Sequence, residues 1–138
     1  MRPIAAMAPL RAFKKQGMEI RQGDIVLFHT GWISLIGKDD KRYGAAEPGL
    51  GIDGAKYLAG KGVVAVGADT WGLEVLPFET KTVFEAQEVR IAHNGIHILE
   101  NMNTAALAAD KGYEFLFVLG APRITGAVQA IINPIAIR

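Results

Sequence analysis

Short apolar runs alternate with helix-like segments along this chain, and that alternation restricts its fold more than any other feature. Residues 24–32, 62–69 and 113–120 are rich in β-branched and aromatic side chains, as buried strands are. Weaker strand patterns lie at residues 95–99 and 131–137. Strands separated by helices pair in parallel through helical crossovers. The pattern therefore predicts an α/β fold with a mixed or mainly parallel sheet.

Three segments outside these runs have helical signals. Residues 9–17 end in a glycine, a residue that commonly ends helices. Asp53 is a candidate N-cap for the segment that follows it. Thr82 is a candidate N-cap for a second segment, which should end near Gly95.

Composition excludes several classes of protein. The 138 residues are enough for a single domain, over 1–138, with a hydrophobic core. The formal net charge is +1 and basic residues do not cluster, which argues against nucleic-acid binding. The sequence has neither an apolar stretch of membrane-spanning length nor the apolar run of a signal peptide, so we expect a cytoplasmic protein that binds no membrane. Without cysteine, only nitrogen and oxygen atoms could hold a metal ion.

Two motifs suggest chemistry that their surroundings do not support. Residues 49–54 read GLGIDG and match the dinucleotide fingerprint, but a polar segment with Pro48 precedes them where the fingerprint needs a strand. His93 and His97 have the spacing of a helical metal-binding pair, yet Gly95 between them marks a helix end. We expect His93 in the last turn of a helix, His97 in a strand, and no joint metal site.

Polar and aromatic side chains follow three of the predicted strands. His29 and Trp32 end the first run, Asp69 and Trp71 follow the second, and Glu100 follows a weaker one. Ligand sites in open α/β sheets are built beyond the carboxyl ends of the strands. Each residue alone could equally be a cap or a surface group, but together they predict one polar crevice. These residues leave open whether Glu100 acts there or is a surface acid.

Four segments, taken in order, resemble a known family. GDIVLFHTGW, GVVAVGADTWGLE, NGIHILENMN and YEFLFVLGAPRITGA are similar to the cyclase family of metal-dependent hydrolases, which includes bacterial kynurenine formamidase (arylformamidase) and isatin hydrolase. The likeness runs from about Gln16 to the C-terminus. It implies a swivelling β/β/α domain, assembled as a homo-oligomer, with zinc or manganese activating water. The implied substrate is a small molecule with an amide or lactam bond.

The resemblance also implies roles for particular residues. Glu100 matches a late glutamate that is a metal ligand in the formamidases. The family's upstream histidine ligand falls in a window that holds Gln87 and Glu88 here, and either can offer oxygen to a divalent ion. Gln87 is the first choice and Glu88 the alternative. The residues expected in the crevice would then line the substrate pocket: His29, Trp32, Asp69 and Trp71.

One part of the family pattern has no counterpart in this sequence. The defining motif places two histidines and an aspartate in a short loop, whereas His29, His93 and His97 stand in other contexts. The chain is therefore expected to correspond to the C-terminal half of a family member, truncated before the main metal cluster. Zinc normally needs three or four protein ligands. Two functions stay open: an amide hydrolase that is weakly active or inactive alone, and a catalytically dead remnant serving binding or oligomeric assembly.

Overall fold

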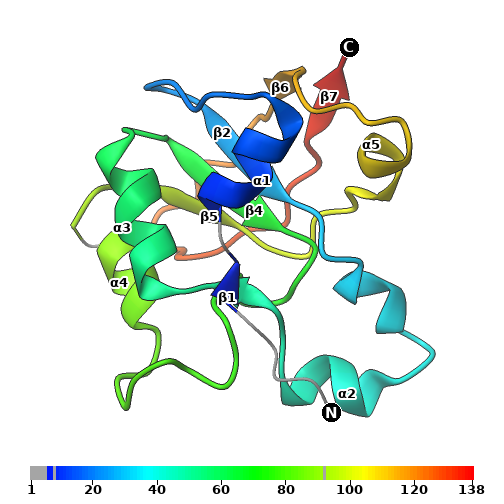
Figure 1. Cartoon of the computed structure of the whole chain (residues 1–138). Coiled ribbons are helices and arrows are strands. Elements are labelled where there is room, and N and C mark those ends of the chain that lie inside the picture. The colour runs from blue at the N-terminus through cyan, green and yellow to red at the C-terminus, as the bar shows by residue number, and fades with distance from the viewer. Residues whose placement is uncertain (1–5, 8, 92) are drawn as a thin grey trace.

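A three-stranded parallel sheet forms the centre of the computed structural model, which describes residues 6–7, 9–91 and 93–138 (Figure 1). Its strands are β2 (Ile25–Phe28), β4 (Ala65–Ala68) and β5 (His97–Leu99), in the order β2-β4-β5. In the register, Ala65 pairs with Ile25 on one side and with His97 on the other. The prediction of an α/β fold with a mainly parallel sheet is confirmed.

The helices make the crossovers that parallel pairing requires. Helix α3 (Ile52–Gly60) lies in the connection from β2 to β4, and α4 (Glu85–Ile91) connects β4 to β5. Helix α1 (Pro9–Gln16) precedes the sheet and stops at Gly17, as predicted, where φ is 69°. None of the described helices is long and apolar enough to cross a membrane.

Two further strand pairs lie outside the parallel sheet. The short strands β1 (Ala6–Met7) and β3 (Gly49–Leu50) pair in parallel. Strands β6 (Leu116–Val118) and β7 (Ile135–Ile137) pair antiparallel with each other. The predicted runs 113–120 and 131–137 therefore form strands that do not extend the parallel sheet.

The two faces of the parallel sheet are covered differently. Alternate residues of a strand point to opposite faces. Val26 and Val66 join the larger apolar cluster with Leu58 of α3, and all three are buried. Leu27 belongs to the second cluster, where it and Phe117 are only partly buried. In Figure 1, α3 and α4 lie on one side of the sheet, and α5 (Ala105–Ala109), β6 and β7 lie on the other.

Two predicted helix caps are wrong. Helix α3 has Gly51 rather than Asp53 as its N-cap, and the backbone N–H of Ile52 donates to Glu79 Oε2 at 2.7 Å. Helix α4 begins at Glu85, so Thr82 does not cap it. These helix starts are bound by carboxylates from elsewhere in the chain, which local sequence patterns do not show.

The start of α4 is one of these cases, and the conformation of His93 also differs from the prediction. The Glu74 carboxylate accepts from the backbone N–H groups of Ala86 and Gln87, at 3.2 and 3.3 Å. Helix α4 is described over Glu85–Ile91, and His93 has turn rather than helical conformation, while His97 lies in β5 as predicted.

Residues 37–48 are expected to form a polar loop, but the segment between β2 and β3 contains two helices. A 3-10 helix, η1, spans Trp32–Leu35, so the first predicted strand ends at Phe28 and not at Trp32. Helix α2 spans Asp40–Ala45, with the Asp39 side chain accepting from the backbone N–H of Arg42. In Figure 1, α2 lies away from the parallel sheet, at the lower right.

Candidate functional site: a polar crevice at the carboxyl ends of the strands

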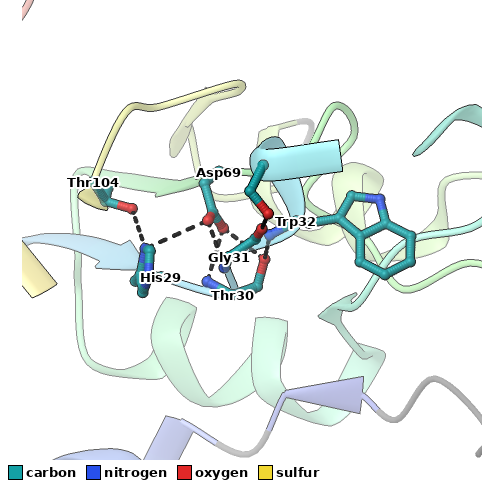
Figure 2. Close-up of polar contacts among 7 residues, drawn as sticks. His29, Thr30, Gly31, Trp32, Asp69 and Thr104 are labelled. Atoms are coloured by element: carbon teal, nitrogen blue, oxygen red, sulfur yellow. Dashed lines mark hydrogen bonds and ion pairs between the residues drawn. The ribbon is translucent and has the colours of Figure 1, made fainter. Parts of the chain in front are cut away.

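Asp69 is the group that joins the ends of β2 and β4 (Figure 2). It follows β4 directly and is fully buried. Its Oδ1 accepts from the Thr30 backbone N–H at 2.8 Å and from the Thr30 hydroxyl at 2.6 Å, while Oδ2 accepts from the Gly31 N–H at 2.7 Å. Gly31 has a φ of 79°, a left-handed conformation that glycine adopts without strain. Asp69 therefore fixes the turn that follows β2.

His29 lies on the other side of the same carboxylate. Its Nδ1 is 2.9 Å from Thr104 Oγ1 and 3.4 Å from Asp69 Oδ2. The His29 side chain is 40% exposed, whereas the Asp69 side chain is not exposed at all. In Figure 2 the Trp32 indole points away from His29. The imidazole and the indole therefore lie on opposite sides of the Asp69 carboxylate.

Tyr43, on α2, contacts both tryptophans. Its backbone carbonyl accepts from the indole N–H of Trp32 at 3.3 Å and from that of Trp71 at 3.0 Å. Its hydroxyl donates to the side-chain oxygen of Asn101, the second residue after β5. The Arg42 guanidinium lies 5.2 Å from the centre of the Trp32 ring. Through Tyr43, α2 is attached to segments that follow all three strands of the parallel sheet.

Glu47 is a buried carboxyl group beside the turn after β4. Its Oε2 accepts from the backbone N–H groups of Trp71 and Gly72, at 2.8 and 3.1 Å. Its Oε1 has no hydrogen-bond partner among the residues that the structure describes. Burial raises the pKa of Glu47 to about 7, against the two N–H groups, which lower it, and the charges of Glu100 and Glu74 raise it further.

Glu100 follows β5 and is partly buried. Burial raises the pKa of Tyr43, and the negative charges of Glu47, Asp69 and Glu100 raise it further. Glu100 also lines a groove of about 480 Å³, together with Leu27 and Phe117 from the second face of the sheet. Glu100 therefore lines this groove and is close enough to Tyr43 for its charge to act on the phenol.

The structure brings together five of the residues that the sequence predicts for the crevice. His29 and Asp69 are in direct contact, Trp32 and Trp71 share the Tyr43 carbonyl, and the charge of Glu100 acts on Tyr43: His29, Trp32, Asp69, Trp71 and Glu100. They lie beyond the carboxyl ends of β2, β4 and β5, where α/β proteins build ligand sites. Whether they bind a substrate stays a prediction.

The two candidates for the second metal ligand lie on α4. The side-chain N–H of Gln87 donates to the Gly72 carbonyl at 3.2 Å, and the Glu88 side chain is exposed. Within the described part of the chain, no group of three or more His, Asp or Glu residues could hold a metal ion. The donor set of these described residues does not fit a complete zinc or manganese site.

Four residues that build the crevice were not predicted from the sequence: Tyr43, Glu47, Asn101 and Thr104. Tyr43 and Glu47 come from the segment expected to be a loop, so no periodic pattern pointed to them. Thr104 had a usable signal, because a threonine before the alanine-rich segment 105–109 is a typical N-cap.

Fold and site together define an α/β protein in which a cluster of acidic, polar and aromatic side chains lies beyond the carboxyl ends of a parallel sheet. A profile of the family described as "Putative cyclase" matches residues 3–75, more than half of the 138 residues, and the chain belongs to this cyclase family. No curated protein matches the chain.

A solved structure agrees with the fold. It is a crystal structure described as that of a novel cyclase, and it matches with a TM-score of 0.81 at 24% sequence identity. The match covers 100% of this chain and 49% of that one, so this chain spans about half the length of the solved cyclase. At this identity the likeness supports the fold and not an activity.

Proposed function

We propose that this chain forms the substrate-facing part of a hydrolase that cleaves amide or lactam bonds. Membership of the cyclase family supports this reaction class, and the crevice supplies a place for it. The observation that carries the proposal is the position of Glu100, which directly follows β5, lines the groove and acts on Tyr43 by its charge. The expected substrate is a small molecule with an amide or lactam bond, the class that the family resemblance implies.

Glu100 is proposed as one ligand of a divalent ion, zinc or manganese, which would supply an activated water when bound. The described residues do not complete such a site, because no group of three or more candidate ligands exists among them. Gln87 is directed to the Gly72 carbonyl, which occupies its side-chain N–H. The remaining ligands are therefore proposed to come from outside this chain.

A second candidate function is a binding or assembly module without catalysis. The exposed apolar side chains of the C-terminal region favour it, since Val128 is 98% and Ile131 99% exposed. Such side chains on a soluble protein suggest a contact with another chain when they lie together. Metal binding distinguishes this candidate from the hydrolase.

The test compares metal binding by the wild type, Glu100→Ala and the control Glu114→Ala. Glu114 is exposed and does not line the groove. Calorimetric titration with zinc or manganese should show weak binding to the wild type. Glu100→Ala should weaken it by about 10–100-fold, and Glu114→Ala should leave it unchanged. Hydrolysis of an N-formyl aryl amine by the chain alone should stay near background. Equal metal binding by wild type and Glu100→Ala would support the assembly module instead.

A further inference from the structure

The imidazole of His29 is held at one nitrogen by two buried groups. Nδ1 lies 2.9 Å from Thr104 Oγ1 and 3.4 Å from Asp69 Oδ2. Both oxygens of Asp69 accept hydrogen bonds from Thr30 or Gly31, so this carboxylate acts as an acceptor. A ring nitrogen that faces an acceptor carries the hydrogen. Nδ1 is therefore the N–H of the neutral ring, and the lone pair is on Nε2.

Thr104 gives independent support, because its hydroxyl is not used where its position predicts. Thr104 is the N-cap residue of α5, yet its side chain makes no capping hydrogen bond. A threonine at this position normally accepts from the first turn of the helix, which stabilises it by about 1 kcal/mol. Here Oγ1 lies within hydrogen-bond distance of His29 Nδ1 instead. The threonine therefore orients the imidazole rather than the helix.

The exposure of these groups shows which edge of the ring a ligand can reach. Asp69 is 0% and Thr104 4% exposed, whereas the His29 side chain is 40% exposed. Nδ1 faces the two buried groups, which leaves Nε2 on the side of the ring that is turned away from them. We propose that His29 Nε2 is the proton-accepting atom of the crevice, with Asp69 and Thr104 as positioning residues. For its substrate, an amide, the inference rests on the proposed hydrolase function.

This arrangement allows Nε2 to accept one proton and to give it back within one turnover. Nε2 takes a proton from water as the water oxygen bonds to the amide carbon, and the carbonyl π electrons move to oxygen. When the carbonyl re-forms, the C–N bond breaks and the imidazolium returns the proton to the leaving nitrogen. One water is consumed, an acid and an amine are released, and nothing is oxidised. Asp69 stabilises the transient imidazolium by its charge.

The test uses para-nitrophenyl acetate, an activated ester whose hydrolysis a proton-accepting imidazole accelerates without any metal ion. The full chain should hydrolyse this ester faster than buffer does. His29→Gln should lower the rate above buffer by a factor of about ten or more. His97→Gln is the matched control, because His97 is also exposed but lies in β5. Thr104→Val should lower the rate, and Thr104→Ser, which keeps the hydroxyl, should restore it. Nitrogen NMR should show the neutral ring of His29 protonated on Nδ1.

Several outcomes would overturn the inference. Equal rates for His29→Gln and His97→Gln would do so, and so would a wild-type rate no higher than buffer. A neutral His29 protonated on Nε2 would contradict the orientation by Asp69 and Thr104. Because the ester needs neither metal nor amide, these results are separate from the metal titration. Ester hydrolysis could depend on His29 while metal binding does not depend on Glu100. That combination would overturn the proposed function and leave the inference about His29 standing.

Discussion

The Glu47 carboxyl group is completely buried, and only one of its two oxygens accepts hydrogen bonds from the part of the chain that the structure describes. Two backbone N–H groups bind Oε2, but Oε1 has no partner within the described residues. An ionised carboxylate with an unpaired oxygen in such a place is costly, because water no longer solvates it. Burial raises its pKa to about 7, and the protonated acid is the form that the surroundings tolerate. Protonation at Oε1 leaves the two hydrogen bonds to Oε2 intact.

The stability of the fold should therefore fall as pH rises through neutrality. The pKa of Glu47 is about 7 in the folded chain against an ordinary value of 4.5. Because the folded pKa is the higher one, the stabilising contribution is complete below pH 4.5 and is lost as pH rises through about 7. The shift corresponds to at most ~3 kcal/mol. Glu47→Gln, which imitates the protonated acid, should flatten the dependence of the unfolding free energy on pH.

Urea unfolding at several pH values between about 5 and 8 measures this effect. Glu114→Gln is the control, since Glu114 is exposed and its replacement should leave the pH dependence as in wild type. Parallel pH curves for wild type and Glu47→Gln would show that another group is responsible.

At the scale of elements, the first glycine of GLGIDG, Gly49, allows close packing around β3. Leu50 in this strand accepts from the Val75 N–H at 3.3 Å and donates to the Leu73 carbonyl at 2.7 Å. A Cβ on Gly49 would lie 2.2 Å from the Glu74 carbonyl carbon. That contact is with backbone, which cannot rotate aside as a side chain can. The motif therefore allows two segments of backbone to approach each other.

Gly49→Ala should consequently destabilise the fold by ~3 kcal/mol, because the strand must separate from residues 74–75 to admit a methyl group. Gly44→Ala is the matched control: Gly44 lies in α2, where an added Cβ meets nothing within 4 Å. That control should gain up to ~1 kcal/mol from alanine's higher helix propensity. Chemical denaturation of both variants measures the difference, and equal stabilities would contradict the close approach.

The parallel sheet could be predicted from the sequence, whereas the elements that complete the crevice could not. The runs that became β2, β4 and β5 are apolar because both faces of the sheet carry apolar clusters, one of them only partly buried, and this packing left a local signature. Helix α2 has no such signature, since none of its residues is buried. What holds it near the site is a backbone carbonyl and a hydroxyl of Tyr43, which contact residues far along the chain. The carboxylates of Glu79 and Glu74 likewise come from distant parts of the chain, and they accept hydrogen bonds from backbone N–H groups in the first turns of α3 and α4.

The site residues divide in the same way. The positions of Asp69, Trp71 and Glu100 at strand ends could be predicted because polar and aromatic residues that follow a buried strand stand out in the sequence, whereas their roles stay a prediction. The metal prediction depended on the family resemblance, and the described donors do not complete it. The dyad of His29 and Asp69 depends on the registry of β2 against β4, which sets Phe28 opposite Ala68 and so places the next residues together. No local pattern contains that information.

At the scale of the whole molecule, the face of the parallel sheet on the side of α5, β6 and β7 is only partly covered. The cluster on that face includes Leu27, Phe117 and Ile132, which are only partly buried. Beyond it, residues 121–131 are all exposed, and Val128 and Ile131 are almost fully so. We propose that a second copy of the chain covers part of this surface.

Sedimentation velocity of the chain over a range of concentrations should therefore show a dimer or a larger homo-oligomer. The double substitution Val128→Asp and Ile131→Asp places two charges on the exposed C-terminal region and should weaken association by at least about tenfold, since each buried unpaired charge is costly. Val83→Asp is the matched control, because Val83 is also exposed, at 61%, but lies before α4, outside the C-terminal region. Equal weakening by the control would place the contact elsewhere. A wild-type chain that stays monomeric at every concentration would mean that the exposed isoleucine and valine side chains do not bind a second copy.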